Sequence, residues 1–464
     1  MVMNRLVTAA VLLGAQLPGT WAAESLSWAD WMRDRRDAVY RDQPGELARL
    51  ARDAEAARAA GDESTWGLLQ GFRLIWLSNN SDAAAEPLAR EAAAALERAP
   101  ADRPGPARLS LLLGLARYRQ DTRDTAGLPR ALEAARAVAD TLKQPAMQAE
   151  VAAAQALYRV YDGDAPAAEV LSQQALAASQ DPLFRREIFL GPQAIARILS
   201  IHTPEAAQRL IGDLDREQAT LDADAYPYMA VNLGAMKAIV LRRVRQPAQA
   251  QQALDRWLAF AQARPGFQLS PSLRNLQASL HRDLKHWAGC IDAATPLTAD
   301  AYVLTTRVDA FMNLATCQAE AQAREAALRS LAALDQLLPA LQDSPATVEA
   351  VLGVQARSYE TLGDAPTALQ NLNASRTWLV AAACHDLRQP DMPWACWRKS
   401  PQPRDGPATG PRWRPCAAPA PACRSCWPIC GRNSRSPPWA RDWRCTSTRS
   451  TPRSAATPIC CAAC

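Results

Sequence analysis

The feature that most limits the possible folds of this chain is a turn sequence that occurs twice. Gly163-Asp164-Ala165-Pro166-Ala167-Ala168 and Gly363-Asp364-Ala365-Pro366-Thr367-Ala368 differ at one position. Glycine adopts the left-handed backbone that ends a helix, aspartate caps the start of the next helix, and proline is tolerated in a first helical turn. Each copy therefore predicts two helices joined by a tight turn.

Weaker copies of this turn recur at a nearly constant interval. They lie at Thr203-Pro204 and Gln246-Pro247, so the prolines of the four copies are separated by 38, 43 and 119 residues. The last interval is about three times 40 residues, so it has room for two more units, which we place near Trp287 and Arg324. The chain is thus predicted to be a series of helix pairs.

Strong helix formers, mainly Ala, Leu, Gln, Arg and Glu, dominate residues 26–374, and no segment there indicates a β-strand. Residues 250–261 place apolar side chains at helical spacing, with polar side chains on the opposite side. The apolar positions are Ala250, Ala253, Leu254, Trp257, Leu258 and Ala261. A helix with such a stripe needs a neighbouring helix to cover it, so we predict an all-α fold.

The spacing of Tyr359, Gly363 and Ala368 resembles that of tetratricopeptide repeats. The resemblance implies a tetratricopeptide-like α-α solenoid over residues 23–374, in which helix pairs stack along one axis. Such a solenoid has a concave surface suited to peptides or helices of other proteins, and no chemistry of its own. We therefore expect a sensor or interaction domain with a peptide or protein ligand.

Residues 1–22 have the pattern of a secretory signal peptide, with an early Arg5, a short apolar run, and small residues before a cleavage position after Ala22. Export to the cell envelope is the expected consequence. The best later candidate for a membrane span, residues 225–241, is interrupted by Asn232 and Lys237.

Only two cysteines, Cys290 and Cys317, precede Cys384. So low a cysteine content indicates a body that is not held together by disulfides, even in an exported protein.

We interpret the histidines and tryptophans of residues 23–374 as structural residues and not as ligand-binding residues. His202, His281 and His286 lack Cys or His partners at metal-ligand spacing, so structural or solvent-facing roles are favoured over a metal site. Four tryptophans are interpreted as core residues between helices in preference to ligand platforms. These are Trp66, Trp76, Trp257 and Trp287. Nothing in the body indicates catalysis.

Residues 375–390 end in His385-Asp386-Leu387-Arg388-Gln389-Pro390, which resembles the phospho-acceptor box of sensor histidine kinases, in particular the hybrid type. The resemblance implies that His385 accepts the γ-phosphoryl group of ATP and that Asp386 accepts or orients its proton. Pro390 would kink the helix. It also implies ATP with magnesium, a response-regulator receiver domain as partner, a homodimer, and an inner-membrane protein whose repeats face the periplasm.

Residues 391–464 have an unusual composition: 12 basic and three acidic residues, a net charge of +9, nine cysteines, and no Leu, Val, Glu, Phe or Tyr. Neither the D-x-G-x-G turn nor the Gly-rich lid of a kinase ATP-binding domain occurs there. The genetic code restricts the codons that can encode residues 391–399. If translation of these codons starts at the third base of each, the product is compatible with H-A-L-G-L-L-A-E, which resembles the sequence after the box in these kinases. Residues 458–464 at the same offset are compatible with D-L-L-R-R-L. We therefore expect a disordered tail in a shifted reading frame.

Other interpretations of this tail are weaker. Cys423, Cys426 and Cys430 have a zinc-like first spacing but no second pair at a suitable distance. The terminal Cys461-Ala-Ala-Cys464 fits the letters of a prenylation box with an atypical last residue. A Pro-broken, Arg-rich segment without a fold signal is a poor nucleic-acid site, and no nucleic acid is expected as partner.

Two functions follow from these observations. The first is a sensor histidine kinase of a two-component phosphorelay, an enzyme by family but truncated and inactive as written, because the sequence shows no ATP-binding site. The alternative is a secreted or periplasmic helical-repeat scaffold that binds proteins without enzymatic activity. Only residues 375–384 separate the repeats from His385. The two therefore share one compartment unless an intervening segment has been lost, and the periplasm has no ATP.

Overall fold

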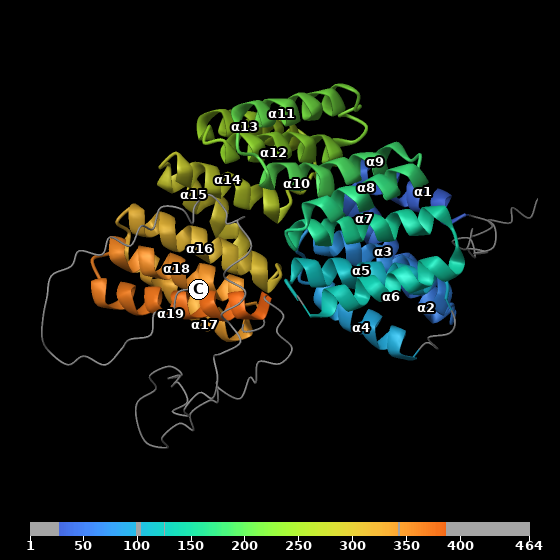
Figure 1. The fold of residues 1–464 in the computed structure, drawn as a ribbon, viewed down its shortest axis with the longest axis horizontal. Coiled ribbons are helices and arrows are strands. Elements are labelled where there is room, and N and C mark those ends of the chain that lie inside the picture. Colours follow the sequence, from blue (N-terminus) through green and yellow to red (C-terminus); the bar gives the residue numbers. More distant parts are fainter. Residues whose placement is uncertain (1–26, 99–103, 125, 342–343, 387–464) are drawn as a thin grey trace, which may run out of the picture. The chain divides into compact units, whose positions relative to one another are not determined.

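The structure, a computed structural model, describes residues 27–98, 104–124, 126–341 and 344–386 (Figure 1). The expected signal peptide, Pro390 and the tail lie outside the described residues. Within them the chain is helical and forms no strand, apart from one isolated β-bridge between Asp82 and Tyr302. The predicted all-α, helical-repeat fold is confirmed. None of the helices in these ranges combines the length and apolar character that crossing a membrane requires.

Successive helices are short and are joined by brief turns, so that each lies against the next (Figure 1). In chain order they are α1 Trp28–Arg41, α2 Gln43–Ala59, α3 Glu63–Asn79, α4 Ala85–Arg98, α5 Pro106–Asp121, α6 Gly127–Leu142, α7 Pro145–Tyr161, α8 Ala165–Ala178, α9 Pro182–Ile188, the π-helix η1 Phe189–Gln193, α10 Ala194–Leu199, α11 Pro204–Ala219, α12 Pro227–Arg243, α13 Pro247–Gln262, α14 Pro271–Asp283, α15 Trp287–Ala294, the 3-10 helix η2 Thr295–Thr298, α16 Leu304–Glu320, α17 Arg324–Leu337, the 3-10 helix η3 Leu338–Leu341, α18 Pro345–Thr361 and α19 Ala365–Asp386.

The repeated turn has the expected geometry at both copies. Gly163 and Gly363 adopt φ of 82° and 81°, in the left-handed region that favours glycine. The carboxylates of Asp164 and Asp364 accept the backbone N–H two residues beyond the start of the next helix, at 3.1 and 3.2 Å. The two extra units predicted inside the 119-residue interval are also present, because α15 begins at Trp287 and α17 at Arg324.

The predicted apolar stripe on α13 faces the core. Ala250, Leu254, Leu258 and Ala261 are buried, and Ala253 and Trp257 pack against them from partly exposed positions. Trp66 and Trp76 are buried core residues, as predicted. Trp257 and Trp287 are only partly buried, but both contact core clusters.

Helices α3 and α5 pack against each other at close range. A Cβ atom added at Gly71 would lie 2.2 Å from the backbone carbon of Ser110, and one at Gly114 would lie 2.6 Å from the carbonyl oxygen of Gly71. No side chain fits between these backbones. Glycine at both positions lets the two helices cross at this short distance.

Most helices contact the helices next to them in sequence, but two segments that are far apart in sequence also contact each other. Backbone N–H groups of Ala83 and Val303 donate to the carbonyl oxygens of Ala301 and Ser81, each at 2.9 Å. The Thr305 hydroxyl donates to the backbone oxygen of Asp121 at 3.1 Å. We call this contact region the latch. It consists of residues 81–83 and 121–123 together with their partners, residues 301–309 and Thr347. A simple solenoid contacts only adjacent repeats, so the latch is an additional tertiary constraint.

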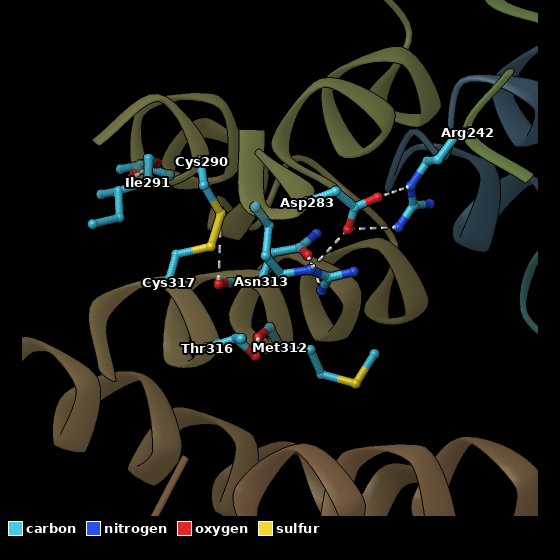
Figure 2. The surroundings of a disulfide bond; sticks show 10 residues. Arg242, Asp283, Cys290, Ile291, Met312, Asn313, Thr316 and Cys317 are labelled. Atoms are coloured by element: carbon cyan, nitrogen blue, oxygen red, sulfur yellow. Dashed lines mark hydrogen bonds and ion pairs between the residues drawn. A yellow bond between two sulfur atoms is a disulfide. The ribbon is translucent and has the colours of Figure 1, made fainter. Parts of the chain in front are cut away.

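The prediction of a body without disulfides is wrong. Cys290 of α15 and Cys317 of α16 are fully buried and form a disulfide, with Cα atoms 6.4 Å apart (Figure 2). They are 27 residues apart in sequence, and the bond joins two consecutive α-helices. Low cysteine content says how many bonds can form, but it does not say whether the two cysteines present lie together.

Candidate ligand-binding cavity

Helices from the first two thirds of the body surround a cavity of about 490 Å³. Its walls come from α1, α2, α3, α5, α6, α7, α9, η1, α10, α12 and α14, so residues separated by more than 200 positions face one space. The lining is mostly apolar, with a small number of charged and amide side chains. Concave, mainly apolar spaces of this size with a few polar groups are typical of sites for small ligands.

A buried charged cluster forms part of the cavity wall. Arg36 of α1 donates from Nη2 to Glu150 of α7 at 2.7 Å, from Nε to Glu187 of α9 at 2.7 Å, and from Nη1 to Asp181 at 3.1 Å. The Arg36 side chain is 5% exposed, whereas that of Glu187, the most accessible carboxylate, is 25% exposed. One guanidinium therefore bridges three segments that are 114 to 151 residues away in sequence.

The electrostatics of this cluster are set by burial. Burial raises the pKa of Glu187 to about 7, although the neighbouring Arg36 acts to lower it. Burial also raises the pKa of Glu150, again against the effect of Arg36. For Arg36, burial acts to lower the pKa, but the three carboxylates outweigh it and the pKa lies above its ordinary value. The Tyr40 hydroxyl hydrogen-bonds Glu187, and burial holds the Tyr40 pKa well above its usual range.

Aromatic side chains stand beside the charged cluster. The ring centroids of Tyr40 and Trp76 are 5.1 Å apart in an edge-to-face arrangement, and those of Phe72 and Trp76 are 6.2 Å apart. All three residues are buried and line the cavity. The Arg36 guanidinium carbon lies 4.8 Å from the ring centroid of Phe184, so a cation already stands against one aromatic face here.

An irregular helix forms another part of the wall. Between α9 and α10 the backbone adopts the π-helix η1, which contains Pro192, and Leu190, Gly191 and Pro192 line the cavity. Proline has no N–H and cannot donate in an α-helix interior, so a local change of register accommodates it. Single π-helical turns inside α-helices are frequently found at functional sites.

The predicted phospho-acceptor residues lie at the other end of the body. His385 and Asp386 fall in the last turn of α19, which continues without a break from the repeat turn at Gly363. Pro390 lies outside the described residues, so the expected kink stays a prediction.

The body histidines are placed as follows. His202 and His286 are exposed, and His281 is partly buried. The rings of His281 and His286 are neighbours, with centroids 6.2 Å apart, although we had interpreted these histidines as separate from each other. Burial lowers the pKa of His281. In the described part of the chain no group of three or more His, Cys, Asp or Glu residues is arranged to hold a metal ion.

No family model matches the chain, and no curated protein matches it at a significant level.

The charged cluster was not predicted from the sequence, although α1 contains a signal for it. Apolar side chains of α1 recur at helical spacing at Trp28, Met32 and Tyr40, and Arg36 occupies the same buried face. A charged residue in such a stripe must be paired. Its partners could not be identified, because Glu150 and Glu187 sit in helices that become neighbours only in the folded chain.

Proposed function

We propose that the helical repeats form a ligand-binding module whose site is the central cavity. The observation that supports it is the combination of a space of about 490 Å³ with buried charged and aromatic side chains in its wall. A purely structural core would fill this space with apolar side chains and would avoid the cost of burying Arg36 with three carboxylates. Binding without catalysis is the role we assign to this module, in line with the repeat resemblance.

We also propose that the chain is exported, which is compatible with a ligand-binding role. The signal-peptide pattern of residues 1–22 predicts secretion, and the disulfide between Cys290 and Cys317 fits an oxidising compartment such as the periplasm. We propose that the module binds its ligand in the cell envelope. The resemblance to tetratricopeptide repeats implies a peptide or protein ligand, and this proposal includes such ligands without naming a particular one.

A second proposal concerns signalling. One continuous helix, α19, joins the final repeat turn to His385 and Asp386. Together with the six-residue box, this continuity supports a module that acts as the input part of a sensor histidine kinase, with α18 and α19 as the connection. ATP with magnesium, the receiver-domain partner and the homodimer belong to this second proposal and rest on the resemblance alone.

A matched pair of glycine variants tests the binding role. An added Cβ at Gly191 of the cavity wall and one at Gly212 of α11 would each meet a single neighbouring atom, at 4.0 Å. Leucine at Gly191 would occupy cavity space, whereas leucine at Gly212 would not. We would screen the full chain against a collection of small molecules and peptides by thermal shift. Compounds that stabilise the wild type and Gly212→Leu but not Gly191→Leu support the proposal; compounds that stabilise all three equally, or none at all, contradict it.

A further inference from the structure

The charged cluster leaves negative charge that its own cation does not neutralise. Arg36 pairs with Glu150, Asp181 and Glu187, so these four groups, when ionised, have a formal charge of −2. Deeply placed carboxylates are costly unless they are paired. Arg117 also lines the cavity, but its charge is opposed by Asp121 one helical turn later. Around Glu187 the carboxylates therefore outnumber the cations, with Glu150 and Glu187 in the cavity wall and Asp181 behind it.

The surfaces next to these carboxylates suit a cation with an apolar body. Tyr40, which bonds to Glu187, packs edge to face on Trp76, and Trp76 contacts Phe72. Aromatic faces attract ammonium groups, and the attraction is strongest when the cation is removed from water. Carboxylates and aromatic rings thus line the same space, and most of the remaining lining is apolar, with some amide and hydroxyl side chains and Arg117.

We propose that the cavity binds a small organic cation, a protonated primary amine on an apolar body, with its ammonium group against Glu187 and Glu150 and its body against Phe72 and Trp76. This inference rests on the proposed binding function and names the ligand class of that same site. The amine can belong to a free small molecule or to the first residue of a peptide, since both present the same group.

Proton release follows from this arrangement. The charged or titratable groups that face Glu187 are Arg36 and Tyr40 of α1, Glu150 of α7 and Asp181 before α9. Because the pKa of Glu187 lies at about 7, part of the empty protein holds a proton there at neutral pH. An arriving ammonium favours the carboxylate form, so the proton leaves to solvent as the amine binds. Amine affinity should then rise with pH through this range.

Three probes of one shape test the charge requirement. Phenethylammonium, 2-phenylethanol and phenylacetate carry a positive, neutral and negative group on the same phenyl body. Calorimetry with the full chain should show phenethylammonium binding at least about tenfold more tightly than the alcohol at about pH 8, and phenylacetate weakest. Repeating the titration in buffers of different ionisation enthalpy should show proton release at about pH 7. Phe-Ala-Ala amide distinguishes a peptide amino terminus from a free amine.

Two isosteric variants separate the site from a general loss of stability. Glu187→Gln should weaken phenethylammonium about tenfold and remove the proton release. Glu46→Gln is the matched control, since Glu46 is also a buried carboxylate paired with arginines, Arg35 and Arg49, but lies outside the cavity wall. Equal binding of the three probes, no binding of any of them, or equal effects of the two variants would overturn the amine assignment. A non-cationic compound whose binding is lost in Gly191→Leu would also overturn it while leaving the binding module intact.

Discussion

Arg123 pairs with Asp309 across 186 residues of sequence, with Nη2 of the arginine 3.4 Å from the carboxylate. The other terminal nitrogen of Arg123 donates to the Thr347 hydroxyl at 2.8 Å. One side chain after α5 therefore contacts both α16 and α18. Because α18 packs along α19, the latch connects the walls of the cavity to the helix that ends at the histidine box.

The first prediction concerns the strength of this latch. Arg123→Ala should lower the free energy of unfolding by about 1 kcal/mol, since it leaves the partly buried Asp309 without its partner. Urea unfolding of the full chain measures this change. Arg136→Ala is the control, because Arg136 forms only an exposed pair with Asp140 within α6. An Arg123→Ala effect no larger than that of the control would show that the latch does not contribute to stability.

The second prediction concerns the crossing of α3 and α5. Gly71→Ala should destabilise the chain by about 3 kcal/mol or more, because its Cβ would overlap the backbone of Ser110 and force the helices apart. Gly212→Ala has space for its Cβ and should stabilise by about 0.5 kcal/mol through helix propensity. Thermal unfolding of both variants gives the comparison. Similar shifts of the same sign would contradict the close crossing.

The sequence predicted local structure well and distant contacts poorly. The turns at Gly163 and Gly363 were predictable, because left-handed glycine, aspartate capping and first-turn proline act within a few residues. The burial of Leu254 and Leu258 followed from helical periodicity. These features depend on the chain next to them, so a single sequence contains the information.

The cavity and the disulfide depend on packing between repeats. Nothing near Arg36 in the sequence identifies Glu150 or Glu187 as its partners, since which repeats face one another depends on the small rotation accumulated at each turn. Cys290 and Cys317 lie on consecutive α-helices, yet their pairing needs the facing register of α15 and α16. Local patterns leave such relationships undetermined.

The third prediction concerns the disulfide. Peptide mapping by mass spectrometry of the chain isolated without reducing agent should show Cys290 linked to Cys317, with neither thiol alkylated before reduction. Replacing both by serine should lower the free energy of unfolding by about 3 kcal/mol, since the bond closes a loop of about 28 residues in the unfolded chain. Cys384→Ser is the control for cysteine substitution. Free, alkylated thiols at both positions would refute the pairing.

The fourth prediction concerns pH and Glu187. Its pKa lies at about 7 in the folded chain against an ordinary value of 4.5, so the folded state binds more protons than the unfolded state between these values. Stability from this group is therefore present at low pH and is lost as pH rises through about 7. Without ligand, the full chain should be more stable at about pH 5.5 than at about pH 8 by about 2 kcal/mol from this group.

Glu187→Gln removes this titrating group and should reduce the difference in stability between the two pH values by about 2 kcal/mol. Glu91→Gln is the control, because Glu91 forms an exposed pair with Arg58. Denaturant unfolding of the three proteins at both pH values gives the comparison. A wild-type chain that is more stable at the higher pH, or a Glu187→Gln profile that parallels the wild type, would contradict the charge assignment in the cavity.

The fifth prediction concerns His385 and the signalling proposal. A neutral imidazole nitrogen can attack the γ-phosphorus of ATP, breaking its bond to the β-phosphate oxygen and releasing ADP, while the adjacent Asp386 accepts the imidazole proton. A complete histidine kinase mixed with the full chain and labelled ATP should therefore transfer acid-labile label to it, whereas the chain alone should stay unlabelled. His385→Gln should abolish the label, and His286→Gln, which changes an exposed histidine 99 residues earlier in the chain, should not. Helix α19 extends to His385 and Asp386, so the backbone of these two residues is helical. Label that persists in His385→Gln, or no label under any of these conditions, would leave the ligand-binding module as the better account of this chain.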